Sequence, residues 1–426
     1  MAGRLASVES RNVTHLSEDW PIFWEEARSA NVRDVDGNVY IDLTSAFGVA
    51  LLGHGSPALL RALEGQRGLV HGMGDVHPPA KKLELLERLA SVSPWPDTRV
   101  VLSGSGSEAV ETALKTAQLA SGRPGILAFR GGYHGLTLGS LAVTERSHFR
   151  APFAERVYGG VAFAPFPDPV REGEKAAARS LETVKALLDA GAPNGDPIGT
   201  LVVEPVQARG GARIPPPGYM AGLTELASQH DVLVVADEIF TGMGRCGSLL
   251  ASARVGLEPD LVCVGKALGA GLPISACMAP AEIMDAWPES DGEAIHTSTF
   301  LGHPLACAAA LGVLEELETG DVRPRARALG ATLVRRLGDR LERLPAVGEV
   351  RGLGLLVGIE LVEPGSMRPR EGAAARLARS ALREGLILLP AGDHGHVVQL
   401  TPPVTVTDDQ VGFVVEALDR CLQALP

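Results

Sequence analysis

Lys266 follows an apolar, strand-like run and precedes a glycine-rich stretch, in the sequence VCVGKALGAGLP (residues 262–273). The chain has six lysines, and the other five lie in helical or charged stretches that are typical of solvated faces. Burial would disfavour the ammonium form of Lys266 and lower its pKa, which suits a lysine that acts as a nucleophile or forms a Schiff base. The alternative is a lysine at a strand end whose ammonium extends to water.

A turn rich in glycine and serine, SGSGSE (residues 103–108), joins a predicted strand to a predicted helix. Its free backbone N–H groups at the start of the helix would form a cradle for phosphate. Gly104, Gly106 and Ala109 also match the dinucleotide fingerprint G-x-G-x-x-A, so an NADP-dependent dehydrogenase is one alternative. The acid expected at the end of the next strand is missing, because Arg130 is the charge found there. A second alternative to the phosphate cradle is an ordinary helix cap made by a serine of this turn.

Asp237 ends the apolar run VLVVAD and needs a compensating partner, which the protonated ring nitrogen of pyridoxal phosphate would provide. A metal-binding acid of the Walker B kind and a helix cap are the alternatives, although the chain has no G-x-x-x-x-G-K-[ST] loop. Tyr133 and His134, in RGGYHGLT, follow a predicted strand, and an aromatic ring there would stack on a flat cofactor or pack within a turn. His394 and His396 do not stand at a zinc spacing, so no metal is expected.

These residues lie at the ends of short apolar strands that alternate with helical patterns. Strands are predicted over residues 98–103, 125–129, 199–206, 231–239 and 260–265, and a helix is predicted over 107–120. Apolar strands separated by helices indicate an α/β fold with a parallel sheet covered on both faces, and such sheets bind ligands at the carboxyl ends of their strands. A phosphate cradle, a lysine, an acid and an aromatic at one edge favour pyridoxal phosphate over a nicotinamide, which needs no such lysine.

The pattern changes after about residue 304, where helices over 305–318 and 325–344 precede strands near 353–361 and 396–404. This order indicates a smaller α+β domain, and a hairpin around Asp36-Gly37 would join it. We therefore expect three segments: an N-terminal segment over residues 1–55, a large cofactor-binding domain over 56–304 and a small domain over 305–426.

The composition restricts the class of protein. The 426 residues are 45% hydrophobic and carry a net charge of −12 with no basic run, so nucleic acid is not expected as a partner. No stretch has the pattern of a signal peptide or the roughly 20 apolar residues of a membrane span. The five cysteines contain no C-x-x-C pair and are typical of reduced thiols, so a cytoplasmic enzyme is expected.

From about residue 30 to its end, the chain resembles the class III (ω-type) pyridoxal-phosphate aminotransferases of fold type I. The matching stretches, in the family's order, are SGSEAVETALKTA, YHG, VVEPVQ, ADEIFTGMGRCG, PDLVCVGKALGAGLPISA and HTSTFLGHPLACAAA. The resemblance implies an aspartate-aminotransferase-like fold with a large, mostly parallel-sheet domain and a smaller α+β domain. It also implies pyridoxal 5'-phosphate as cofactor, small-molecule amine and keto-acid substrates, and a homodimer.

The resemblance implies a role for each matching residue. Lys266 would form the Schiff base and move the substrate proton, Asp237 would pair with the ring nitrogen, and Ile239 and Tyr133 would pack on the two ring faces. The other residues expected around the cofactor are Ser105, Gly106 and Ser107 at the phosphate, His134 beside Tyr133, Glu204 and Gln207 near the phenolic oxygen, and Thr299 at the phosphate of the neighbouring subunit.

Two departures concern the substrate. Many relatives have an arginine before T-P-P that binds the substrate carboxylate, and Gln399 stands there in VVQLTPP. Many also have a glutamate after E-P-V-Q-G that masks this arginine, whereas this chain has Arg209, which would bind a carboxylate or face solvent. Phe47 is expected in the pocket wall. We expect an aminotransferase for a substrate whose reacting end lacks an α-carboxylate, such as an ω-amine or an amino sugar; the alternative is a racemase or epimerase on the same scaffold.

Overall fold

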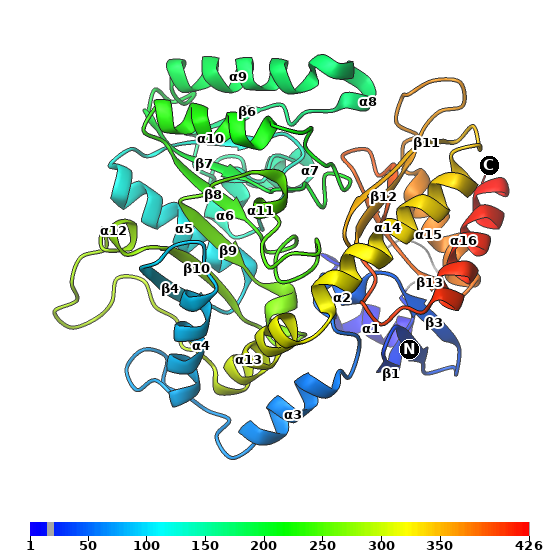
Figure 1. Ribbon diagram of the computed structural model, residues 1–426, viewed down its shortest axis with the longest axis horizontal. Coiled ribbons are helices and arrows are strands. Elements are labelled where there is room, and N and C mark those ends of the chain that lie inside the picture. The colour runs from blue at the N-terminus through cyan, green and yellow to red at the C-terminus, as the bar shows by residue number, and fades with distance from the viewer. Residues whose placement is uncertain (15–20, 426) are drawn as a thin grey trace.

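The carboxyl ends of six strands meet at one edge of a seven-stranded sheet (Figure 1), in a computed structural model that describes residues 1–14 and 21–425. The strand order is β4-β10-β9-β8-β7-β5-β6. The strands are β4 (Thr98–Ser103), β5 (Gly125–Phe129), β6 (Val161–Ala164), β7 (Ile198–Val203), β8 (Leu233–Asp237), β9 (Leu261–Val264) and β10 (Ser275–Pro280). The predicted α/β fold with a mostly parallel sheet is confirmed.

Strand β10 was not predicted, and it runs antiparallel to both of its neighbours, β4 and β9. The chain turns back from β9 through the short 3-10 turn Lys266–Gly269, which leaves no room for the helical crossover that a parallel strand needs. Because β10 is reversed, β4 and β9 point the same way. The turn after β4 and the lysine after β9 therefore lie at the same sheet edge.

Alternate residues of the sheet strands pack against helices on opposite faces. Val202 joins the apolar cluster of helix α5 (Gly106–Ser121), whereas Leu201 and Val203 join the cluster that includes α9 (Ala176–Ala190) and α10 (Tyr219–Gln229). Burial on both faces explains why these strands are continuously apolar. Helix α5 ends at Gly122, which adopts the left-handed φ of +66°.

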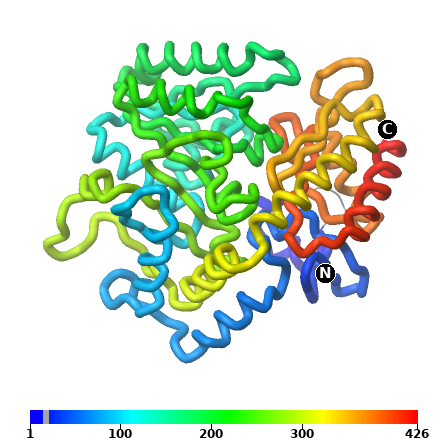
Figure 2. The backbone as a smooth tube through the Cα atoms, in the orientation of Figure 1, coloured from blue at the N-terminus to red at the C-terminus, as the bar shows by residue number. Residues whose placement is uncertain are grey.

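Two smaller four-stranded sheets lie beside the large sheet, and Figure 2 shows that the blue N-terminal strands adjoin C-terminal elements. One contains β1 (Trp24–Arg28), β2 (Asn31–Asp34), β3 (Val39–Asp42) and β13 (Leu386–Ile387), and the other contains β11 (Val347–Leu353), β12 (Leu356–Leu361), β15 (Val397–Leu400) and β14 (Leu389–Ala391). Strand β3 pairs antiparallel with β2 and parallel with β13, so N-terminal strands and a C-terminal strand share one sheet. The domain limits at residues 55 and 304 stay a prediction.

Helices cover and connect these sheets (Figure 1). The longer ones are α3 (Pro57–Gln66), α4 (Ala80–Ser91), α13 (Pro304–Thr319), α14 (Val322–Leu341), α15 (Ala373–Arg383) and α16 (Asp408–Gln423). The shorter ones are α1 (Ala2–Val8), α6 (Leu138–Val143), α7 (Ser147–Arg150), α8 (Pro169–Glu172), α11 (Ser252–Val255) and α12 (Ala281–Met284). No helix of the described residues combines the length and apolarity that crossing a membrane requires.

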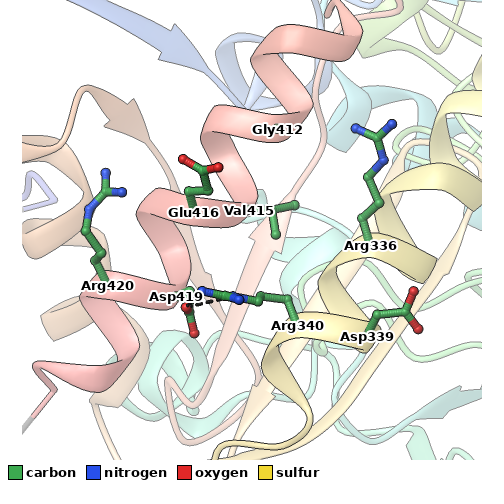
Figure 3. A pocket seen from close by; sticks show the side chains of 8 residues that line it. All are labelled: Arg336, Asp339, Arg340, Gly412, Val415, Glu416, Asp419 and Arg420. Carbon is green, nitrogen blue, oxygen red and sulfur yellow. Dashed lines mark hydrogen bonds and ion pairs between the residues drawn. The ribbon is translucent and has the colours of Figure 1, made fainter.

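Helices α14 and α16 form an open groove on the outside of the small domain (Figure 3). Arg340 spans it and donates to the buried carboxylate of Asp419 at 2.7 Å. This ion pair ties the two helices together and lies apart from the sheet edge that carries Lys266, so we assign it a structural role.

The segment labelled α2, Ser45–Gly48, is a left-handed turn. Its residues have φ values of +47°, +47°, +64° and +87° in order, and only the last residue is a glycine. L-residues in this conformation cost roughly 1–2 kcal/mol each. Three strained residues in succession therefore require contacts that hold them.

Helix α14 packs closely on the β11–β12 turn at Gly330, and a substitution there tests this packing. A Cβ at Gly330 would lie 1.9 Å from the carbonyl oxygen of Gly354, so Gly330→Ala should lower the free energy of unfolding by about 2 kcal/mol or more. Gly338→Ala in the same helix is the control, because its Cβ would meet only Glu342 at 3.8 Å and should stabilise by about 0.5–1 kcal/mol. Urea unfolding measures both, and equal effects of the two substitutions would contradict this packing.

Candidate active site

A cavity of about 200 Å³ lies at the carboxyl edge of the large sheet. It is lined by predicted site residues from five segments: Gly106, Ser107, Tyr133, His134, Glu204, Arg209, Asp237, Ile239 and Lys266. Gly135 and Phe240 complete the lining. Residues far apart in the sequence are therefore brought to one site.

Lys266 begins the turn after β9 and extends along the ring of Phe240, with Nζ 4.7 Å from the ring centroid. Burial lowers the pKa of Lys266, and the carboxylates of Asp237 and Glu204 oppose this effect. The φ of Lys266 is +42°, a conformation that non-glycine residues rarely adopt. A strained lysine with a lowered pKa is typical of a reacting amine rather than of a surface cation.

Asp237 ends β8 and is buried, with both carboxylate oxygens engaged. Its Oδ2 lies 2.7 Å from His134 Nδ1, and its Oδ1 accepts the N–H of Ile239 at 3.0 Å. Burial alone would lower the pKa of His134, but its hydrogen bond to Asp237 and the charge of Asp237 raise that pKa above its ordinary value. These two contacts fix the orientation of Asp237 at the cavity.

Glu204 follows β7 and is buried beside this pair. Its oxygens accept the N–H groups of Tyr133 at 3.1 Å and Ala208 at 2.9 Å. Burial raises the pKa of Glu204 to about 7, although the nearby His134 lowers it in part. Glu204 therefore holds together two loops that carry lining residues.

The start of helix α5 faces the cavity, and two glycines allow its close contacts. The N–H groups of Gly106 and Ser107 have no intrahelical acceptor because they lie in the first turn. A Cβ at Gly106 would lie 2.9 Å from Ile239 Cγ2, and one at Gly135 would lie 2.2 Å from Ser107 Oγ. Ser105 caps the helix by accepting the N–H of Glu108 at 3.3 Å, so the cap and the cradle coexist.

Arg209 reaches the cavity from the loop that follows Glu204. Burial and the neighbouring guanidinium of Arg146 lower the pKa of Arg209. Its Nη1 donates to the carbonyl of Pro390 at 3.2 Å, and the described residues give it no carboxylate partner. Asp393 instead lies between Arg146, at 4.0 Å, and Arg213, at 3.7 Å. Positive charge is thus left in excess at this corner.

Five predicted site residues do not line the cavity. Gln207 is buried and donates to the carbonyl of Arg130 at 2.9 Å, and its Oε1 has no hydrogen-bond partner among the described residues. Gln399 is only 2% exposed and donates to the carbonyl of Ala208 at 3.3 Å. Phe47 is half exposed in the left-handed turn, Thr299 lies in a loop of exposed residues before α13, and Ser105 caps α5.

Two residues of the cavity lining and one buried lysine elsewhere were not predicted. Phe240 and Gly135 stand next to predicted residues, and their neighbours Ile239 and His134 were the available signals. The expectation that Lys82 belongs to a solvated face was wrong: Lys82 is buried and donates to the carbonyl of Gly74 at 3.3 Å. Helix α4 turns this lysine inward, where burial lowers its pKa.

The donor set fits pyridoxal phosphate. The cavity brings a lysine amine, an oriented carboxylate, two side chains for ring faces and free amides to one place, and the Cβ positions above show that its walls leave no room for larger residues at Gly106 and Gly135. The fold and the site together define an amine-transferring enzyme that uses this cofactor.

Comparison with known proteins gives the family. The sequence model of the class-III aminotransferases matches residues 13–422, and the chain belongs to this family. It is 36% identical over 418 residues to 4-aminobutyrate aminotransferase of Mycobacterium tuberculosis, covering 94% of this chain and 90% of that protein. It is 32% identical over 410 residues to leucine/methionine racemase of Thermococcus litoralis, covering 94% and 90%.

A solved structure shares the architecture. An amine transaminase from an uncultivated Pseudomonas species, with pyridoxal phosphate bound, matches with a TM-score of 0.88 and 31% identity, covering 98% of each chain. Pyridoxal phosphate is accordingly the cofactor of this chain, and fold type I is its fold. The dehydrogenase alternative left open by G-x-G-x-x-A is therefore set aside.

The raised pKa of Glu204 predicts a pH-dependent effect of Glu204→Gln. Folding raises this pKa from 4.5 to about 7, so the stability that the neutral carboxyl gives is present below pH 4.5 and is lost as the pH rises through about 7. Glutamine does not ionise, so the variant should gain on the order of 2–3 kcal/mol relative to wild type between about pH 5 and 8. Urea unfolding of cofactor-free protein across this range measures the difference. Glu64→Gln, at an exposed position, is the control, and a difference independent of pH would contradict the raised pKa.

Proposed function

We propose that this aminotransferase moves an amino group from an ω-amino acid to a 2-oxo acid, with Lys266 as the reacting lysine. The observation that carries this proposal is that Lys266 and Arg209 face the same cavity, and that Arg209 has no carboxylate partner among the described residues. The substrate of the mycobacterial relative, 4-aminobutyrate, has an amine at one end and a carboxylate at the other. A donor of this kind presents its amine to Lys266 without requiring an arginine at position 399.

Pyridoxal phosphate, when bound, supplies an aldehyde that bonds to amines and a ring that withdraws electrons from the carbon bearing the amine. We assign to Lys266 Nζ the bond to this aldehyde and, once displaced by substrate, the transfer of the proton from that carbon. Its lowered pKa favours the free amine that both tasks need. The Asp237 side chain, held by His134, would pair with the protonated ring nitrogen.

The remaining lining residues would hold the cofactor in place. Ile239 and Tyr133 would contact its two ring faces. The amides of Gly106 and Ser107, with Ser105 ending the turn, would bind its phosphate at the start of helix α5. Glu204 and Gln207 would lie near its phenolic oxygen. The Oε1 of Gln207, which has no hydrogen-bond partner among the described residues, would be an acceptor there; if the side-chain amide were rotated, its NH2 group would be a donor instead.

Arg209 would bind the substrate carboxylate, and Gln399 would support it. Gln399 holds the carbonyl of Ala208, the residue before Arg209, so the two departures from the family pattern are physically connected. Phe47, half exposed beside Gly48, would contact the part of the substrate that extends outward. Both an ω-amino acid and a 2-oxo acid have the carboxylate that this arrangement requires.

Arg209→Gln tests the carboxylate site. A charge-assisted hydrogen bond contributes about 1.5–3 kcal/mol, so the KM for 4-aminobutyrate and for 2-oxoglutarate should rise by about 10- to 150-fold with a smaller change in kcat. The KM for an uncharged amine such as 1-phenylethylamine should stay within about twofold. Arg213→Gln, on the same loop but outside the cavity lining, is the matched control. Equal losses for charged and uncharged donors would overturn this assignment.

Racemisation is the second candidate, and the similarity to leucine/methionine racemase together with Gln399 favours it. The same lysine would then return the proton to the substrate carbon. Solvent deuterium entering the α-carbon of leucine without consumption of a 2-oxo acid distinguishes this reaction from transamination.

We also propose a homodimer in which Thr299 contributes to the neighbouring site. Thr299 does not line the cavity of its own chain, and its loop exposes large apolar side chains, with Ile295 at 69% and Phe300 at 67%. The segment containing Gly74 lies against this loop, since a Cβ there would be 3.1 Å from the carbonyl of Ser298. A second copy of the chain covering this face would remove both side chains from water.

Mixing two inactive variants tests this arrangement. If Thr299 serves the neighbouring site, a heterodimer of Lys266→Ala and Thr299→Val chains contains one site with both wild-type residues. Activity should therefore reappear on refolding the two together, up to about half of the wild-type value per heterodimer. If Thr299 served its own chain, both sites of the heterodimer would be defective and the mixture would stay inactive. Size-exclusion chromatography with light scattering verifies the dimer.

The cysteines support a cytoplasmic location. All five are buried and free, and none has a disulfide partner in the described residues. Burial raises the pKa of Cys307 to about 12, and it also raises that of Cys421. Thiols of this kind fit a reducing compartment.

A further inference from the structure

The left-handed turn Ser45–Gly48 lies directly beside the reacting lysine. A Cβ at Gly48 would be 3.2 Å from Phe240 Cζ and 3.5 Å from Lys266 Cδ. Phe240 is the ring along which the ammonium of Lys266 lies. The turn therefore backs the lysine stem and the ring that supports it, although it contributes no group to the cavity lining.

Asp42 holds the strained part of this turn through its buried carboxylate. Its Oδ2 accepts the N–H of Ala46 at 2.9 Å, and its Oδ1 accepts the N–H and hydroxyl of Thr44 at 2.8 and 2.6 Å. His54 Nε2 lies 2.9 Å from Oδ2. Burial alone would raise the pKa of Asp42, but these hydrogen bonds keep it below its ordinary value, so the acceptor remains a carboxylate.

Contacts from two other parts of the chain complete the anchoring. The hydroxyl of Ser45 donates to the carbonyl of Thr401 at 2.6 Å, after β15. The fully buried Arg245 donates to the carbonyl of Gly48 at 3.4 Å and also to that of Pro402 at 2.6 Å. A strained conformation persists only where its surroundings fix it, and here they do so from both sides of the turn.

We propose that Asp42 is a positioning residue for the reaction: it holds the left-handed turn Ser45–Gly48 against Phe240 and Lys266 and thereby fixes the lysine amine. Asp42 touches none of the reacting groups. It acts through Ala46, whose N–H would lose its acceptor if the carboxylate were removed, and the relaxed turn would leave space beside the lysine stem. This inference rests on the proposed role of Lys266.

Asp42→Asn tests the proposal with nearly unchanged shape. The amide keeps one acceptor oxygen for Thr44 but offers N–H groups towards Ala46. Cofactor-free protein is mixed with pyridoxal phosphate, reduced with borohydride at timed intervals and mapped by mass spectrometry, which measures how fast Lys266 becomes labelled. The expected result is labelling slower by about tenfold and kcat lower by about tenfold or more, with little change in KM.

Asp34→Asn is the matched control. Asp34 is also a buried aspartate in the same small sheet, and it accepts backbone N–H groups from Asp36 at 3.0 Å and Asn38 at 2.9 Å in its own turn. This variant should lose comparable thermal stability while labelling at the wild-type rate. A second substitution, Ala46→Gly in the Asp42→Asn background, should restore labelling to within about threefold, because glycine adopts positive φ without an anchor.

The outcomes separate the two hypotheses. Labelling of Lys266 at the wild-type rate in Asp42→Asn, or a rescue of melting temperature without a rescue of rate, would overturn the positioning role. Labelling of a different lysine in the wild type would instead overturn the role of Lys266. If Asp42→Asn does not fold, Ser45→Ala takes its place: it removes the anchor to Thr401, and slower labelling supports the proposal whereas an unchanged rate overturns it.

Discussion

Charge buried at the carboxyl edge of the sheet is the constraint on which the rest of the structure depends. Lys266, Asp237, His134 and Glu204 lie within one region from which water is largely removed. Isolated charges are costly there, so the three other groups are hydrogen bonded, whereas the Lys266 side chain lies along the ring of Phe240. The His134–Asp237 contact and the two backbone N–H groups on Glu204 meet this requirement and connect three loops. The same contacts that make the charges tolerable therefore determine the shape of the site.

The immediate return of β10 is the fold feature that connects this cluster to the start of helix α5. Strands β4 and β9 run in the same direction, so the lysine after β9 and the β4–α5 turn lie at the same sheet edge. Because β10 returns immediately, Ser275 at its start donates to the carbonyl of Ser105 at 2.6 Å. This bond links the lysine turn to the start of helix α5. The reacting amine and the free amides are thereby held by one short section of sheet.

Much of the fold and of the cavity could be predicted from the sequence, because strands buried on both faces are continuously apolar and their ends carry the polar residues. Glu204 after β7, Asp237 at the end of β8 and Lys266 after β9 line the cavity together with Tyr133 and His134 after β5, whereas Gln207 does not. Strand β10 was missed because its pairing direction depends on the length of the preceding connection rather than on its composition. The inward orientation of Lys82 was missed for a similar reason: two adjacent lysines look alike in sequence, and only the packing of α4 distinguishes them.

Strand β13 shows what a pairing between distant segments means for folding. Residues Leu386 and Ile387 complete the sheet that begins with β1, β2 and β3, so Ile41 and Asp42 pair with residues that are synthesised much later. The left-handed turn after β3 likewise depends on Thr401 and Pro402. During synthesis, the N-terminal strands and this turn must wait, without their partners, until residues 386–402 have been made. Closing so long a loop is slow, so the turn beside Lys266 takes its final form only after that closure.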